Sequence, residues 1–210
     1  MSGDPPVEEA AEVALAGGLV VLPTDTVYGV GTRPDDAAAT GRVFAAKGRP
    51  RDLELPVLVP SYEAATGIAV FDERATTLAD RFWPGALTLV LPRTARSSGW
   101  DLGGDVTTIG VRVPRHPLAV ALLARTGPLA VTSANRSGEP PASRCDDAVA
   151  ALGDAVGIVL CDERALDAAP STVLDLAHGP PRILRQGALT AAELADALGD
   201  AEGPSASDDG

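Results

Sequence analysis

Three residue types are almost missing from this 210-residue chain, which has one lysine, Lys47, one asparagine, Asn135, and one glutamine, Gln186. Aromatic residues make up only 3% of it, so the core must be built from aliphatic side chains. Arginine supplies the remaining positive charges. The two side chains are not interchangeable at every anion-binding site. A GC-rich genome explains the depletion in general. It does not explain why Lys47 and Asn135 both fall in short polar segments.

Other absences exclude whole classes of protein. No apolar run approaches the roughly 18 residues of a membrane-spanning helix, and the first residues lack the basic head and apolar run of a signal peptide. The two cysteines, Cys145 and Cys161, form no metal-binding pattern, and we expect two buried free thiols in a reducing interior. The protein is therefore expected to be cytoplasmic, without membrane contact.

The common nucleotide and metal motifs are also missing. Gly29-Val30-Gly31 continues to Pro34 where a dinucleotide-binding motif needs a third glycine, and no P-loop occurs. Without an HExxH segment or a His/Cys cluster, no metal ligands are expected from the protein. A net charge of −12 argues against a face that holds nucleic acid through its phosphates, although a local basic cleft remains compatible with it.

The hydrophobic pattern predicts an α/β fold. Helical spacing of apolar residues predicts helices at 7–16, 37–46, 74–82, 118–125, 145–152 and 191–198. Short apolar runs predict strands at 19–22, 56–59, 86–91, 107–113, 129–132, 157–160, 172–176 and 182–184. Some strands follow one another directly, so we predict a single domain with a twisted, mixed sheet of parallel and antiparallel strands and flanking helices. Residues 203–210 are expected to be a disordered acidic tail.

Polar segments follow several of the predicted strands and helices. One runs from Thr24 to Gly29, and another, Lys47-Gly48-Arg49-Pro50-Arg51, places three cations within five residues. Further segments are 112–117, 132–138, 171–172 and 185–187. Each alone has an ordinary explanation, such as a helix cap, a solvated basic turn or an ion pair at a sheet edge. Together they are expected to meet in a cleft, since α/β sheets build ligand sites at strand ends.

In this order the segments resemble those of the YrdC/Sua5 family, the L-threonylcarbamoyladenylate synthases. That family is marked by PTDTVYG, a KxR pair followed by Pro, VRxPxHP, SxN, STV and a late RxG, and all six occur here. Lys47 and Asn135 fall on the KxR and SxN positions. The resemblance implies a YrdC-like catalytic domain over 7–190, with a central positively charged cavity, followed by a C-terminal helix at 191–202.

The resemblance also implies an enzyme, a nucleotidyltransferase. It would join L-threonine, bicarbonate and ATP into threonylcarbamoyl-AMP and pyrophosphate, for the t6A modification of tRNA. A downstream threonylcarbamoyl transferase complex is a possible partner, and contact with tRNA is expected to be weak or indirect. Mg²⁺ is expected to enter with ATP, because no dedicated set of metal ligands is visible.

Roles of individual residues follow from the same motifs. Lys47 and Arg49 would be catalytic, facing the triphosphate and the carbamate. The residues implied to hold L-threonine, with the guanidinium on its carboxylate, are Thr24, Arg112, Thr132 and Ser171. The residues implied to bind ATP are Lys47, Arg49, Arg51, Ser133, Ala134, Asn135, Ser143 and Arg185.

Two departures from the family pattern affect these roles. Five residues, RDLEL, separate Pro50 from Pro56 where many relatives have three, so the loop beyond Arg51 is not predicted. Ala142 lies where Ser or Thr is expected, and Ser143 is the candidate substitute.

Two other functions are considered. The main alternative is a non-catalytic module that binds tRNA or double-stranded RNA, against which the net charge counts. The second is a carbamoyl-phosphate-using domain of the kind found in hydrogenase maturation proteins, which normally belongs to a much longer chain.

Overall fold

The computed structural model describes residues 5–166, 169–199 and 205–206, and the statements below refer to these. The helices are α1 (Pro5–Leu15), α2 (Ala37–Lys47), α3 (Tyr62–Thr66), α4 (Glu73–Phe82), α5 (Pro117–Thr126), α6 (Cys145–Leu152) and α7 (Ala191–Leu198). The strands are β1 (Val20–Pro23), β2 (Tyr28–Thr32), β3 (Val57–Leu58), β4 (Leu87–Pro92), β5 (Thr108–Arg112), β6 (Leu129–Ser133), β7 (Ile158–Val159), β8 (Thr172–Asp175), β9 (Arg182–Arg185) and β10 (Ser205–Ala206).

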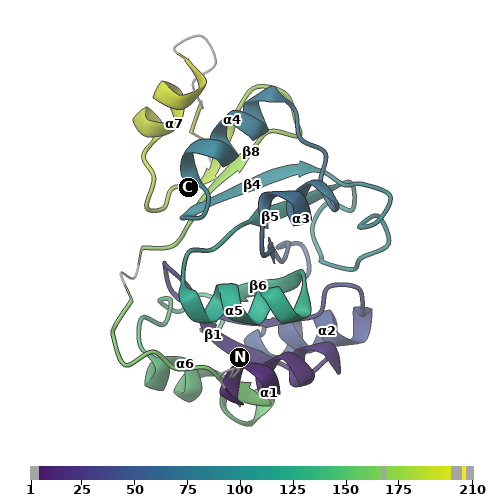
Figure 1. Cartoon of the computed structure of the whole chain (residues 1–210), viewed down its shortest axis with the longest axis vertical. Coiled ribbons are helices and arrows are strands. Elements are labelled where there is room, and N and C mark those ends of the chain that lie inside the picture. Colours follow the sequence, from purple (N-terminus) through teal and green to yellow (C-terminus); the bar gives the residue numbers. More distant parts are fainter. Residues whose placement is uncertain (1–4, 167–168, 200–204, 207–210) are drawn as a thin grey trace.

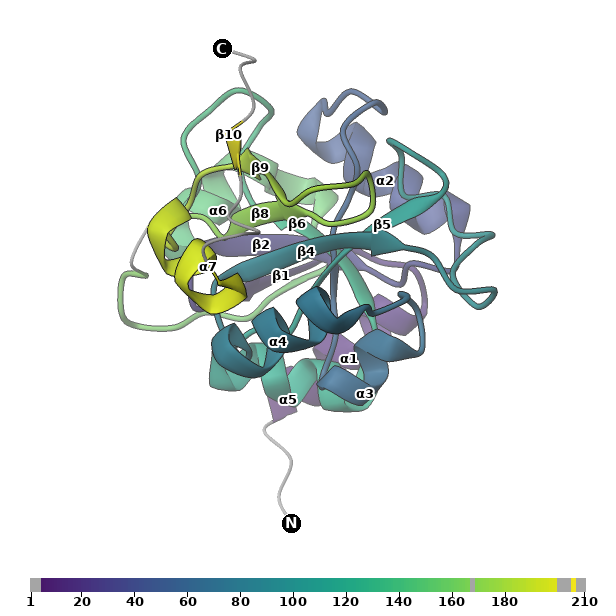
Figure 2. The same cartoon turned by 90° about the horizontal axis from the view of Figure 1, so that it is seen from above.

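The described strands form one sheet in the order β10-β9-β8-β4-β5-β3-β6-β2-β1-β7. Figure 1 labels β8, β4, β5, β6 and β1 of this sheet. Its ladders are of both kinds: β4 pairs antiparallel with β5 and parallel with β8, and β3 pairs parallel with β5 and antiparallel with β6. Figure 2 shows α1, α3, α4 and α5 on one side of the sheet and α2 and α6 on the other. The predicted mixed α/β sheet with flanking helices is confirmed.

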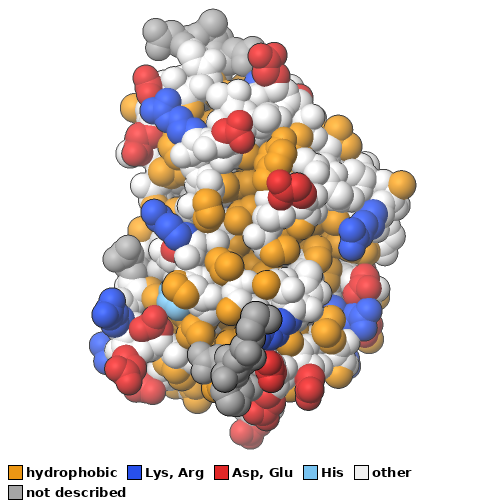
Figure 3. Space-filling view, in the orientation of Figure 1, with side chains coloured by type: hydrophobic (Ala, Val, Ile, Leu, Met, Phe, Trp, Pro, Cys, Tyr) orange, Lys and Arg blue, Asp and Glu red, His pale blue; other side chains and the backbone are white. Residues whose placement is uncertain are grey.

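Aliphatic side chains form two buried clusters. The smaller one joins α1 and α5 to β1 and β6, through residues such as Ala10, Leu22, Leu122 and Leu129. The larger one includes Phe44 of α2 and side chains of α4, β4 and β5. Apolar side chains also reach the surface between the helices in the view of Figure 3. None of the described helices combines the length and the apolar character needed to cross a membrane.

Strand β2 was not predicted from the sequence, and it contains Gly29 and Gly31. In the sheet both glycines face β6 at close range. A Cβ atom at Gly29 would lie 2.6 Å from Val131 Cγ1, and one at Gly31 would lie 2.6 Å from Val131 Cγ2. The missing side chains therefore let two strands approach, a role that the one-dimensional pattern does not distinguish from a turn. Helix α3 was also missed; its N-cap Ser61 accepts from Ala64 N.

The prediction of two free thiols is wrong for this structure. Cys145 and Cys161 are paired in a disulfide, with their Cα atoms 5.5 Å apart. Cys145 begins α6, and Cys161 follows β7, which pairs with β1. Helix α6 packs against β1, so the two cysteines meet through contacts between distant elements. Their 16-residue spacing alone could not indicate this.

The C-terminal region differs partly from expectation. Ser205–Ala206 pair in parallel with β9, so this part of the predicted disordered tail is ordered. The predicted C-terminal helix at 191–202 ends earlier, since α7 stops at Leu198. Residues 200–204 and 207–210 lie outside the described residues.

Candidate functional site

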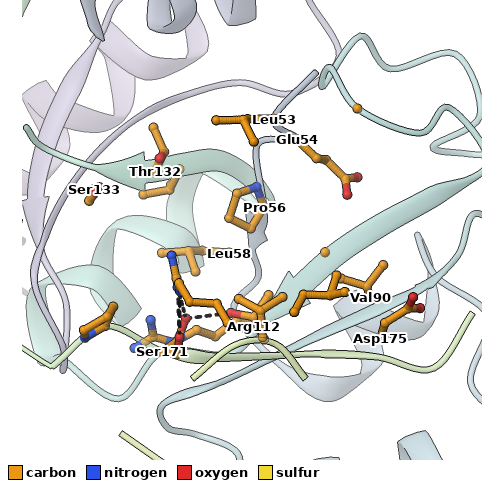
Figure 4. A pocket seen from close by; sticks show the side chains of 18 of the residues that line it. Leu53, Glu54, Pro56, Leu58, Val90, Arg112, Thr132, Ser133, Ser171 and Asp175 are labelled. Carbon is orange, nitrogen blue, oxygen red and sulfur yellow. Dashed lines mark hydrogen bonds between the residues drawn. The ribbon is translucent and has the colours of Figure 1, made fainter. Parts of the chain in front are cut away.

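A cavity of about 600 Å³ lies over one face of the sheet. Side chains alternate along each strand, so one face enters the core and the other faces the cavity. In β4, Leu87 and Leu89 belong to the core, whereas Thr88 and Val90 line the cavity. The same period of two places Arg112 of β5 in the cavity wall (Figure 4).

The cavity collects residues from distant parts of the chain. Of the residues assigned from the sequence, those that line it are Thr24, Arg49, Arg112, Thr132, Ser133, Ser171 and Arg185. A second cavity, of about 480 Å³, is lined by Ala134 and Asn135 and shares Pro141 with the first. Lys47, Arg51 and Ser143 line neither of these two cavities.

Arg112 is held by three contacts at the end of β5. Its Nε donates to Gly85 O at 2.8 Å, its Nη1 to Thr26 Oγ1 at 3.1 Å and its Nη2 to Asp25 Oδ1 at 2.7 Å. Burial lowers the pKa of Arg112, and the Asp25 charge opposes that shift. Arg112 therefore does form an ion pair, which was the ordinary explanation for its segment, although β5 is an interior strand and not an edge of the sheet. The second Asp25 oxygen is buried without a hydrogen-bond partner.

Arg185 lies on the same part of the wall. Its Nη2 donates to Ser171 O at 2.8 Å and to Ser171 Oγ at 3.1 Å. Burial lowers the pKa of Arg185, and the charges of Arg112 and Arg49 lower it further. Three guanidinium groups thus lie close enough to disfavour one another, and an anion among them would relieve this repulsion.

Helix α2 ends at Lys47, where Gly48 adopts a left-handed φ of 60° that stops the helix. Lys47 is only 3% exposed. Its ammonium donates to the backbone oxygens of Ser133 and Asn135, and Nζ lies 3.5 Å from Asn135 Oδ1. Desolvation, with a contribution from Arg49, lowers the pKa of Lys47 to about 8. The lone lysine and the lone asparagine are therefore in contact.

The loop after α2 sends its two arginines in different directions. Arg49 lines the cavity and donates to Leu53 O at 3.1 Å and to Glu54 O at 3.0 Å. Burial lowers the pKa of Arg49. Arg51 instead pairs with Asp101 at 2.8 Å, at the surface. The segment RDLEL thus brings Glu54, which the sequence did not single out, into the cavity wall.

Acidic groups occupy another part of the cavity, and Figure 4 shows Glu54 and Asp175 away from Ser171. Desolvation raises the pKa of Glu54 to about 8. His178 lies between Asp175, at 2.9 Å, and Asp105, at 3.3 Å, and the hydrogen bond to Asp175 is the main cause of its raised pKa. Four arginines and four carboxylates line the cavity. Its positive charge is therefore confined to the part of the wall around Arg49, Arg112 and Arg185.

Several residues in or beside the cavity had no assigned role from the sequence. Asp25 lies between two threonines of the PTDTVYG segment, so its position was a usable signal for a partner of Arg112. Glu54 lies in the segment RDLEL, whose path was not predicted from the sequence. Asp175 and His178 lie three residues apart, whereas Asp105 lies 73 residues before His178. None of them belongs to a recognised motif, and only the fold brings Asp105 to the other two.

The donor atoms present limit how the protein could bind a metal ion. In the described ranges, no three His, Cys, Asp or Glu side chains form a group that could hold a metal ion. Mg²⁺ that arrives with phosphates needs only one or two carboxylates from the protein. The cavity offers such groups, and Oε1 of Glu54 is buried there without a hydrogen-bond partner. The donor set therefore fits Mg²⁺ that is shared with a nucleotide.

The fold and the site define a class of α/β proteins with a mixed sheet and a polar cavity whose arginines suit an anionic ligand. Within this class, the chain belongs to the Sua5/YciO/YrdC family. The model of that family, described as telomere recombination, matches residues 12–187.

Curated relatives and a solved structure agree with this membership. A Mycobacterium leprae protein, named provisionally as a threonylcarbamoyl-AMP synthase, is 45% identical over 90% of this chain and 87% of its own length. The threonylcarbamoyl-AMP synthase of Bacillus subtilis is 36% identical over 94% of this chain. The crystal structure of Pyrococcus abyssi Sua5 with L-threonine matches 94% of this chain, with 35% identity and a TM-score of 0.85. The chain spans 58% of the length of each of these last two proteins.

Proposed function

We propose that this chain is a threonylcarbamoyl-AMP synthase, acting as a nucleotidyltransferase on L-threonine, bicarbonate and ATP. The observation that carries the proposal is the convergence of motif residues on one cavity, with Arg49, Arg112 and Arg185 beside the hydroxyl groups of Thr132 and Ser171. Relatives that carry this name, and the L-threonine complex of one of them, support it.

The chemistry asks for positioning rather than a protein nucleophile. The ammonium group of threonine and bicarbonate form a carbamate, with release of water and a proton. A carbamate oxygen then attacks the α-phosphorus of ATP, and the bond from that phosphorus to pyrophosphate breaks. Both steps gain from holding the reactants together and from neutralising negative charge. The cavity offers groups for both tasks.

The threonine subsite is proposed around Arg112, with Thr24, Thr132 and Ser171. A guanidinium group has five N–H donors, and the three contacts of Arg112 engage one each. In the described part, two donors therefore remain for the threonine carboxylate. Asp25 would keep the guanidinium oriented while the substrate binds.

The nucleotide subsite is proposed around Lys47 and Arg49. The Lys47 ammonium has three N–H donors: two bond backbone oxygens, and the third makes only a long contact of 3.5 Å with Asn135 Oδ1, which a phosphate or carbamate oxygen would replace. Other proposed contacts come from Ser133, Ala134, Asn135 and Arg185. Arg51, Ser143 and the buried Lys47 would have to move to reach ATP, because none of the three lines either cavity.

Mg²⁺ bound with ATP would neutralise phosphate charge in this reaction. A carboxylate of the cavity would hold it. We place the reaction in the cytoplasm, where ATP and tRNA occur, and a downstream threonylcarbamoyl transferase would receive the product. The surface pairing of Arg51 and the net charge of −12 give no support to a direct RNA contact.

The proposal is tested by pyrophosphate release from ATP. Release is expected only when L-threonine and bicarbonate are both present. Release that does not depend on threonine would reject the substrate assignment. Affinity for tRNA that falls steeply with salt, in a protein without ATP turnover, would favour the RNA-binding alternative.

A further inference from the structure

One charged side chain of the cavity has no established part in the proposed reaction. Glu54 precedes β3, and its side chain lines the cavity with 18% of its surface exposed. Figure 4 shows it on the wall away from Arg112 and Ser171. Its Oε1 atom is buried and makes no hydrogen bond in the described structure.

The neighbours of Glu54 compensate its charge only in part. Nη2 of Arg93 lies 3.7 Å from Oε1, beyond hydrogen-bond distance, and is itself buried without a hydrogen-bond partner. The other nitrogens of Arg93 donate to backbone oxygens of Thr108 and Trp100. Desolvation raises the pKa of Glu54 in spite of the Arg93 charge. One carboxylate oxygen therefore has the Arg93 cation 3.7 Å away but no hydrogen-bond donor.

Two of the other carboxylates in the cavity already have partners. Asp175 pairs with His178 at 2.9 Å and accepts from a backbone N–H at 2.9 Å. Asp105 accepts from the backbone and hydroxyl of Thr107, and its second oxygen lies 3.3 Å from His178. Asp52 is exposed to solvent. Glu54 is distinguished from all three by its buried, unsatisfied oxygen.

Glu54 also adjoins a group proposed to hold phosphate. Arg49 donates to the backbone oxygen of Glu54 itself, so an anion on this guanidinium would lie near the Glu54 side chain. Two like charges about 4 Å apart repel, and the repulsion is stronger near a protein surface than in water. A divalent cation between carboxylate and phosphate would turn this repulsion into attraction.

We propose that Glu54 is the carboxylate through which this chain holds the Mg²⁺ that enters with ATP. The proposal rests on the proposed function, because it requires ATP in this cavity. One carboxylate is enough for Mg²⁺ whose other ligands are phosphate oxygens and water.

The test compares the affinities for metal-free ATP and for Mg²⁺–ATP, measured by calorimetry in wild type and in Glu54→Gln. Magnesium is expected to strengthen ATP binding in wild type, and this strengthening is expected to fall about tenfold in the variant. Glu12→Gln, which removes a charge from the exposed face of α1, should keep the wild-type ratio. The resonance spectrum of Mn²⁺ in the ATP complex should also differ between wild type and Glu54→Gln.

The outcomes separate the two proposals. An unchanged ratio in Glu54→Gln, or identical Mn²⁺ spectra, overturns the role of Glu54 and leaves the ATP site in place. Failure of wild type to bind ATP overturns both. If Glu54→Gln does not fold, because Arg93 loses its partner, Glu54→Asp is used instead. It keeps the charge but shortens the reach, so a ratio equal to that of wild type would again reject the assignment.

Discussion

Replacement of Lys47 by methionine should remove activity without a large loss of stability at neutral pH. The two side chains are similar in length, but methionine has no charge to bury. Desolvation lowers the pKa of Lys47 from 10.5 to about 8, which corresponds to a cost of about 3 kcal/mol for burying the ammonium. Methionine would relieve this cost. It would also leave two backbone oxygens without their donor, at about 1–3 kcal/mol each. The opposing effects are of similar size.

The difference in stability between wild type and Lys47→Met should change with pH in a definite direction. Between about pH 8 and 10.5 the unfolded chain holds the Lys47 proton more often than the folded one, so wild-type stability should rise with pH in this interval. Lys47→Met lacks this rise. The variant should therefore fall behind wild type as the pH increases from 8 to 10.5. Urea unfolding at several pH values measures the difference.

Turnover supplies the second readout. Loss of a group that neutralises transition-state charge typically costs about 10²–10³ in kcat. Wild-type turnover should also decline above about pH 8, as Lys47 loses its proton. Arg42→Met, which removes an exposed charge from the same helix, is the control. Full turnover in folded Lys47→Met, or a stability difference that does not change with pH, would refute the reasoning.

Three further predictions concern stability. His178→Ala should destabilise the protein more at pH 6 than at pH 9. Because the pKa of His178 is raised in the folded protein, its ion pairs stabilise the fold at low pH and are lost as the pH rises through that pKa. Urea unfolding at both pH values measures the difference. Gly31→Ala should cost about 1–3 kcal/mol through its clash with β6, whereas Gly99→Ala, with open space around it, should change the thermal midpoint little. Cys145→Ser should cost about 3 kcal/mol under oxidising conditions, as expected for a loop of this length, and nothing measurable in reductant, where the bond to Cys161 is absent.

Most elements could be predicted from local patterns, because their signals lie within a few residues. The run ALTLVL at 86–91 has the length and composition of a strand, and it forms β4. Helix α6 occupies the predicted residues 145–152. The failures share a different cause. The glycines of β2 and the pairing of Cys145 with Cys161 both depend on contacts with distant segments.

The site was predictable only as a set of segments. The motifs predicted that polar residues would meet, and the cavity does contain Arg49, Arg112 and Arg185. The expected location at strand ends was incomplete, because side chains within β4 and β5 also line the cavity. Which face of a strand would be covered by a helix, and which left open, depends on the arrangement of the whole sheet. The same applies to the pairing of Arg112 with Asp25.

An acidic protein can still hold an anion, because net charge and local charge act over different distances. At physiological salt, exposed charges are largely screened beyond about 8 Å, so most of the −12 units have little effect inside the cavity. Partly buried charges are screened much less. Burial lowers the pKa of Arg185, and the charges of Arg112 and Arg49 lower it further, which indicates a local positive potential. Net charge therefore argues against an extended RNA-binding face, but it does not argue against a triphosphate in this cavity.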